Sequence, residues 1–377
     1  MQPLGLNGDL QVGGHRLHVQ TTYSANNEKI ISHVFDQGRI ISQREESCAG
    51  ESSADALSKK VKAVHFDVIS EMELLFFMAE KVRRAKHAPS CTRLGQIFIT
   101  KNLFADALAI LQLALELAPE APDARLLAGI AHLRLGEIDK AEAVLRQGLQ
   151  LAPNYADLHY YMGVTRMEQN RLLEAMQEFE AALAINPKFF LAKFHLALAL
   201  LLTLHSSFEA ESHLPPASIR SKRVQEHLAA LFQMPAALND VSRIQAALDL
   251  MRMGELTAAL EELQGMRREA QSDYGFGLES EFYLKFIYGG KARDEAFITH
   301  YAERLRAAIQ ETPEYADLHN DLGIAYLIQC RNLFLRALEE FRLALEINPN
   351  YKRAEKNLKI SENDGKGFLI LLRALLM

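Results

Sequence analysis

The side chains that could do chemistry are scattered along this chain without the spacing of a catalytic or metal site. His15 and His18 are the closest pair among 13 histidines. They fall on a predicted strand, where an odd separation sends two side chains to opposite faces. Cys48, Cys91 and Cys330 lie far apart, so the sequence predicts neither a zinc site nor a disulfide framework.

Motifs for nucleotide or acyl chemistry are missing too. Gly289-Gly290-Lys291 lacks the preceding glycine and the following hydroxyl that a phosphate-binding loop needs. The acidic pairs Glu261-Glu262 and Glu339-Glu340 are interpreted as solvated helix faces, and no nucleophile elbow is present. We therefore expect no enzymatic activity, no cofactor and no metal.

Composition indicates a globular protein without an electrostatic preference for nucleic acid. The 377 residues are 49% apolar and 24% charged, and 42 basic against 48 acidic residues give a net charge of −6. The basic residues Arg220, Lys222 and Arg223 are interpreted as a solvated helix start or loop, with a phosphate or nucleic-acid patch as the alternative. No apolar run long enough to span a membrane and no secretory signal are visible, so we expect a cytoplasmic protein.

The strongest signal is an internal repeat. Pro119, Pro153 and Pro187 lie 34 residues apart. A glycine stands upstream of each proline. Twelve residues after each glycine comes an alanine, and four residues after the alanine comes a large apolar residue. The three sets are Gly95, Ala107 and Leu111; Gly129, Ala141 and Leu145; and Gly163, Ala175 and Phe179. Small residues let two antiparallel helices approach closely, and proline separates one helical hairpin from the next. One hairpin cannot bury its apolar face alone, so the spacing predicts stacked hairpins.

This pattern resembles the tetratricopeptide repeat, a 34-residue helix–turn–helix unit. The resemblance covers three units in 88–187 and returns in 316–349, which has two extra residues in its turn around Cys330 to Phe334. Tyr155 to His159 and Tyr315 to His319 are identical in sequence. The stretch 240–273 keeps Ala247, Ala259 and Leu263 but lacks the proline, and 275–313 keeps only the second helix and Pro313.

The segments outside the repeats complete a mostly α-helical architecture. Leu17, Val19, Thr21 and Tyr23 alternate as in a half-buried strand, and Asp36-Gln37-Gly38 is a plausible tight turn, so we expect a small β-hairpin or meander over 15–44. We expect an α-solenoid built from the following segments: 1–50, a small β segment; 51–87, a connecting helix; 88–202, four repeats; 203–239, an interruption; 240–350, degenerate and then regular repeats; 351–377, a capping helix and an apolar tail.

Two apolar segments could pack within the chain or against another molecule. The predicted connecting helix, capped by Ser52 or Ser53, carries apolar residues at steps of three and four. They are Leu57, Val61, Val64, Val68, Met72, Leu75 and Met78. We expect this helix either to cover the sheet and the end of the first repeat or to form a dimer seam. The tail from Gly367 to Met377 folds back onto the last repeats, contacts a partner subunit or touches a membrane surface.

The resemblance implies that the first helix of each repeat lines a concave groove. Its lining, the predicted groove residues, would be Gln96, Ile99, Leu126, Ile130, Leu133, Arg134, Tyr160, Val164, Met167, Phe194 and Leu198. Family members that grip a C-terminal carboxylate use Lys, Asn and Arg at sites where this chain has Thr92, Gln96, Asp157 and Tyr161. That clamp is therefore not expected, and the mostly apolar lining suits an amphipathic helix.

These observations favour a non-enzymatic scaffold or adaptor that binds a protein or peptide partner in the groove. One alternative is a structural protein that self-assembles, as a homo-oligomer, through 55–87 and the apolar tail. Another is a regulator that senses a ligand through the β segment 15–44 and transmits the result through the repeats. The sequence does not name the partner.

Overall fold

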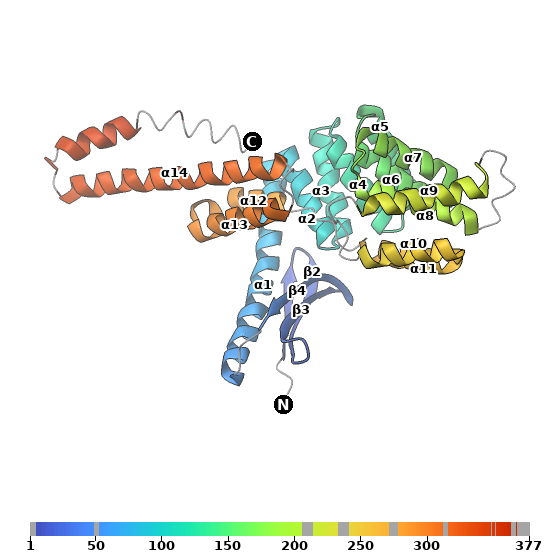
Figure 1. Cartoon of the computed structure of the whole chain (residues 1–377). Coiled ribbons are helices and arrows are strands. Elements are labelled where there is room, and N and C mark those ends of the chain that lie inside the picture. Colours follow the sequence, from blue (N-terminus) through green and yellow to red (C-terminus); the bar gives the residue numbers. More distant parts are fainter. Residues whose placement is uncertain are drawn as a thin grey trace. The chain divides into compact units, whose positions relative to one another are not determined.

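The computed structural model describes residues 5–48, 53–205, 214–232, 241–270, 278–311, 316–347, 349–350, 352–362 and 367. The chain divides into two compact units, residues 1–280 and 281–377. Helices dominate both units, and the first also holds a small antiparallel sheet (Figure 1). The predicted mostly α-helical solenoid with a small N-terminal sheet is confirmed.

The sheet is a meander of four antiparallel strands in the order β1-β2-β3-β4. Its strands are β1 Gly5–Val12, β2 His15–Ser24, β3 Lys29–Asp36 and β4 Arg39–Ser47. The predicted turn after Asp36 is confirmed, with Gln37 and Gly38 both at positive φ (49° and 82°). Strand β1 was not predicted, because its sequence GLNGDLQV contains few of the branched and aromatic residues that favour strands.

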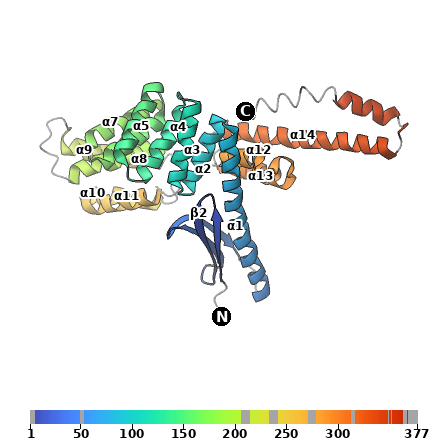
Figure 2. The same cartoon turned by 180° about the vertical axis from the view of Figure 1, so that it is seen from behind.

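The helix α1, Ala54–Ala85, lies along the sheet (Figures 1 and 2). Ser53 caps it by accepting a hydrogen bond from the Ala56 backbone N–H. All seven residues of its predicted apolar stripe are buried, and Leu57, Val61 and Val64 form a core cluster with Ile30 and Cys48 of the sheet. The stripe therefore packs within the chain, as the covering-helix interpretation expects, and is not available as a dimer seam.

In the described part of the first unit, five helical hairpins follow α1. They are α2 Ala88–Thr100 with α3 Phe104–Leu117, α4 Pro122–Arg134 with α5 Ile138–Leu151, α6 Ala156–Glu168 with α7 Leu172–Ile185, α8 Phe190–His205 with α9 Ala217–Leu231, and α10 Val241–Met253 with α11 Leu256–Ala270. Each pair packs along its length. Figure 1 shows α2 to α9 succeeding one another as a stack.

The repeat glycines hold the first three hairpins together. A Cβ placed on Gly95 would lie 2.6 Å from Leu111, one on Gly129 2.5 Å from Leu145, and one on Gly163 2.5 Å from Phe179. No side chain fits there without displacing the second helix, since real Cβ contacts are longer. The periodic small and large residues of the sequence are therefore the two sides of one helix–helix contact.

The turns of these hairpins share one backbone feature, a residue in the left-handed region. Asn102, Gly136 and Asn170 have φ of 52°, 75° and 59°. The residue after each donates its backbone N–H to a carbonyl five residues earlier, as in the Leu103 to Phe98 bond of 2.8 Å. This geometry ends the first helix and satisfies its last carbonyls.

The predicted interruption at 203–239 contains part of a fourth hairpin. Helix α8 continues to His205, and α9 lies within the predicted gap. Arg220 was interpreted as solvated, but it is buried and donates to the Thr203 backbone carbonyl at 2.7 Å and to the Pro215 carbonyl at 2.9 Å. That role is structural, and the buried guanidinium of Arg220 is not available to bind a phosphate or a nucleic acid. Residues 206–213 and 233–239 lie outside the described part of the chain.

The second unit departs from the predicted hairpin over 316–349. It holds most of α12 Leu278–Ile287, a short turn at Lys291–Arg293, α13 Glu295–Glu311 and α14 Ala316–Ile347, with a further helical stretch over 352–362. Helix α14 runs without a break through the position of the expected turn (Figure 2). The hairpin prediction is wrong there, although the residues that suggested it are all present.

No helix among the described residues is long and apolar enough to span a membrane. Most of the apolar tail, residues 368–377, lies outside the described residues, so its predicted contacts stay a prediction.

Candidate peptide-binding groove

The first helices of the hairpins, α2, α4, α6 and α8, pack side by side. The predicted groove residues on each helix are mostly three or four positions apart, as Tyr160, Val164 and Met167 are on α6. These steps keep the residues on one face of a helix. The stack therefore aligns four such faces, with the second helices on the other side.

The structure places most of the predicted groove residues in the interior. Buried are Ile99, Leu126, Ile130, Tyr160, Val164, Met167, Phe194 and Leu198. Half-buried are Gln96, Leu133 and Arg134. Part of this burial comes from the hairpins themselves, since the Tyr160 ring packs against Phe179 of α7 and against Phe189.

Helix α11 covers the face at the third and fourth hairpins. It packs against α8, and the Arg267 guanidinium forms an ion pair with Glu168 at the end of α6. Near the start of α11, Thr257 Oγ1 lies 3.5 Å from His205 Nδ1 of α8. Leu263 and Met266 of α11 are buried. The chain thus lays one of its own amphipathic helices on the predicted groove.

The same stretch of chain also reaches the first hairpin. Glu279 forms an ion pair of 3.0 Å with Arg93 of α2. The next residue, Ser280, donates its hydroxyl to Gln96 Oε1 at 2.7 Å. Residues 271–277, between these contacts and α11, lie outside the described part of the chain. Both ends of the predicted groove are therefore occupied by the chain itself.

The sequence model of the tetratricopeptide repeat family matches residues 99–163. These residues span the turn and the second helix of the first hairpin, the whole second hairpin and the first part of α6. The chain carries tetratricopeptide repeats.

Solved structures with the same kind of repeat resemble parts of this chain. The crystal structure of MamA shares 20% sequence identity with this chain and has a TM-score of 0.36. The match covers 48% of this chain and 99% of the MamA chain. YrrB, described as having an unusual peptide-binding site, is 18% identical over 54% of this chain and 97% of its own, with a TM-score of 0.35. The first repeat domain of Spaghetti bound to an HSP90 peptide is 21% identical over 32% of this chain and 94% of its own, with a TM-score of 0.30. No curated protein matches the chain.

One histidine is enclosed where the tetratricopeptide repeats meet α11. His195 of α8 is buried, and its Nδ1 donates to the Leu191 carbonyl at 3.0 Å. Burial, together with the charge of Arg267, lowers the pKa of His195 to about 3. The ring therefore stays neutral at physiological pH. His195 therefore has a packing role.

The histidines considered as metal ligands have other partners. His15 lies between two carboxylates, 3.0 Å from Asp36 and 3.0 Å from Asp106 of α3, and so links the sheet to the first tetratricopeptide repeat. His18 is on the opposite, exposed face beside Asp9, as its odd separation from His15 predicts. Among the described residues, no three His, Cys, Asp or Glu side chains are grouped to hold a metal.

Sequence reasoning missed the residues that cover the groove. Ala247, Ala259 and Leu263 correctly predicted a helical pair, and all three are buried. Nothing in that pattern indicates that α11 turns back onto α8.

Proposed function

We propose that the tetratricopeptide repeats over 88–202 bind an amphipathic helix of a protein partner, and that the chain is a non-enzymatic scaffold or adaptor. The observation that carries this proposal is α11, which already lies on the face that the partner would use. A surface that accepts a helix from its own chain has the shape and polarity to accept a similar one from another chain.

The contacts of α11 describe the ligand that this face takes. Its Met266 is buried, and the next residue, Arg267, meets Glu168. A partner helix would therefore present an apolar face, with a basic residue directly after one of its apolar residues. Binding requires α11 to leave, so the affinity for the partner is lowered by the stability of the internal contact.

A labelled peptide with the sequence of residues 256–270 tests the proposal on the full chain. Arg267→Glu places like charges together at Glu168 and should loosen α11. The labelled peptide should then bind the variant about fivefold more tightly than the wild type, as expected for a change of roughly 1 kcal/mol. Fluorescence anisotropy measures both affinities.

A charge exchange supplies the matched control. Adding Glu168→Arg to Arg267→Glu restores the internal pair with its signs reversed, and the fivefold gain should disappear. If the labelled peptide binds none of the three chains, this face does not accept a helix from outside. Aspartate at Ile130 or Leu198 would be a poor test, because both are buried and the substitution would unfold the repeats.

Self-assembly through 55–87 gains no support, since the apolar stripe of α1 is buried in the chain. Ligand sensing by the β segment stays a prediction.

A further inference from the structure

Helix α14 contains the sequence of a tetratricopeptide-repeat hairpin in a single straight helix. Asn102-Leu103-Phe104 begins the turn and second helix of the first hairpin, and Asn332-Leu333-Phe334 repeats it inside α14. Asn102 is left-handed, whereas Asn332 lies within the helix. The helix of 32 residues is about 48 Å long, so its two halves cannot fold onto each other while it stays straight.

The residues that would pair in a hairpin are consequently apart. In the regular hairpins a glycine receives a leucine or phenylalanine of the second helix. In α14 the corresponding glycine, Gly323, has no described atom within 4 Å of a Cβ placed on it. Phe341, its counterpart from the repeat pattern, is 18 residues away, or about 27 Å along the axis.

These residues form one stripe on the straight helix. Gly323, Tyr326, Cys330, Phe334, Ala337, Phe341 and Ala344 follow one another at steps of three and four. Three of the four buried residues of α14, Ala325, Ile328 and Asn332, lie on the opposite side from the stripe, and the fourth, Leu338, borders it. Gly323 and Cys330 are exposed, and Tyr326 is 42% exposed with its hydroxyl accepting a hydrogen bond from Arg306 of α13. The remaining stripe residues, Phe334, Ala337, Phe341 and Ala344, are half-buried. Such steps are those of a helix that packs along a second helix.

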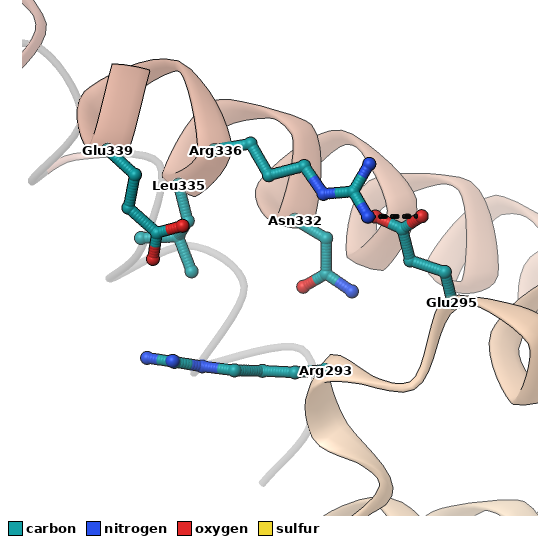
Figure 3. A pocket seen from close by; sticks show the side chains of 6 residues that line it. All are labelled: Arg293, Glu295, Asn332, Leu335, Arg336 and Glu339. Atoms are coloured by element: carbon teal, nitrogen blue, oxygen red, sulfur yellow. Dashed lines mark ion pairs between the residues drawn. The ribbon is translucent and has the colours of Figure 1, made fainter. Parts of the chain in front are cut away.

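The second unit holds the turn sequence straight. Arg331 donates to the Ala292 backbone carbonyl at 2.6 Å, and Arg336 forms an ion pair of 2.8 Å with Glu295. Figure 3 shows this ion pair beside Asn332 and Arg293, in a small pocket between α14 and the start of α13. Bending α14 at Asn332 would break contacts on both sides of the bend. These contacts therefore oppose the folding of the two halves of α14 onto each other.

We propose that a second copy of this chain covers the stripe, with the two α14 helices antiparallel and centred on Asn332. In that register Gly323 of each copy receives Phe341 of the other, and Cys330 lies opposite Phe334. Each copy thereby supplies the second helix that the other lacks, which is a domain swap. The occupant is a copy of this chain because the two halves of α14 already carry the two sides of the repeat contact. This inference does not depend on the groove.

Disulfide trapping tests the pairing directly. In a Cys330→Ser background, Gly323→Cys with Phe341→Cys should give a covalent dimer after mild oxidation, visible on a non-reducing gel. A disulfide within one chain would overturn the proposal, because it would require α14 to close on itself. The absence of any disulfide would overturn it as well.

Light scattering on uncrosslinked protein keeps the test independent of the introduced thiols. The wild-type chain of 42.4 kDa should have twice that mass at micromolar concentration. Gly323→Arg should halve the measured mass, whereas Glu346→Arg, exposed and outside the stripe, should leave it unchanged. A wild-type monomer at every concentration, or equal masses for both variants, would contradict the swap.

Discussion

The third hairpin and α14 contain nearly the same sequence pattern and differ in structure. Both include the phrase Tyr-Ala-Asp-Leu-His, a glycine eight residues after its start and a phenylalanine that follows. In the third hairpin Gly163 and Phe179 are in contact across a turn at Asn170. In α14 the helix continues through Asn332.

The two extra residues in α14 explain the difference. Each helical residue adds a rotation of about 100°, so two residues turn the asparagine by roughly 200°. Asn332 therefore faces the start of α13 and is buried there, with its side-chain amide 3.5 Å from the Ala292 carbonyl. A repeat pattern thus predicts that two helices are compatible, whereas the residues between them decide whether they meet within one chain.

The largest difference between the two regions is expected when their glycines are replaced by leucine. Gly129→Leu should cost about 3 kcal/mol or more of unfolding free energy, because its Cβ would lie 2.5 Å from Leu145. Gly323→Leu should cost nothing within a chain and gain up to about 1 kcal/mol from helix propensity. Urea unfolding followed by circular dichroism, at a concentration where the chain is monomeric, measures both. Equal losses would mean that Gly323 is packed like Gly129.

Acid should weaken the tetratricopeptide repeats through His195. The unfolded ring takes a proton below about pH 6.5, whereas the folded ring stays neutral down to a pKa of about 3. The unfolding free energy should therefore fall as the pH is lowered from 6.5, by up to about 1.4 kcal/mol per pH unit. His195→Phe removes this contribution, so its stability should depend less on pH. Identical pH profiles for the two chains would show that His195 is protonated in the folded state.

A smaller difference is expected at the two asparagines. Asn102→Ala should cost about 1 kcal/mol, because alanine tolerates the left-handed conformation poorly. Asn332→Ala should cost less, because the gain in helix propensity offsets part of the loss of its hydrogen bonds, which are a weak one to the Ala292 carbonyl and one that its Oδ1 accepts from Arg331 at 2.7 Å. Thermal unfolding of the two variants compares them. A matching loss at Asn332 would indicate that it forms a turn.

Caps, turns and contacts within a hairpin were predictable from the sequence, because residues close together along the chain determine them. Ser53 as a cap, the turn after Asp36 and the Gly163–Phe179 contact all follow from residue types at fixed spacing. The covered groove was not predictable in this way, and the two extra residues in α14 were visible in the sequence without indicating that the helix would stay straight. Both features depend on where Arg267 and Arg331 find partners far along the chain, and periodicity does not encode such contacts.

The distance between the two ends of α14 tests the central claim most directly. Spin labels at Asn320→Cys and Glu346→Cys, in a Cys330→Ser background diluted with unlabelled chain, report the distance within one molecule. Over these 26 residues a straight helix predicts about 39 Å between the labelled backbone positions. A hairpin would bring the labels to within about 20 Å, because packed helices lie 8–10 Å apart, and that result would contradict the account.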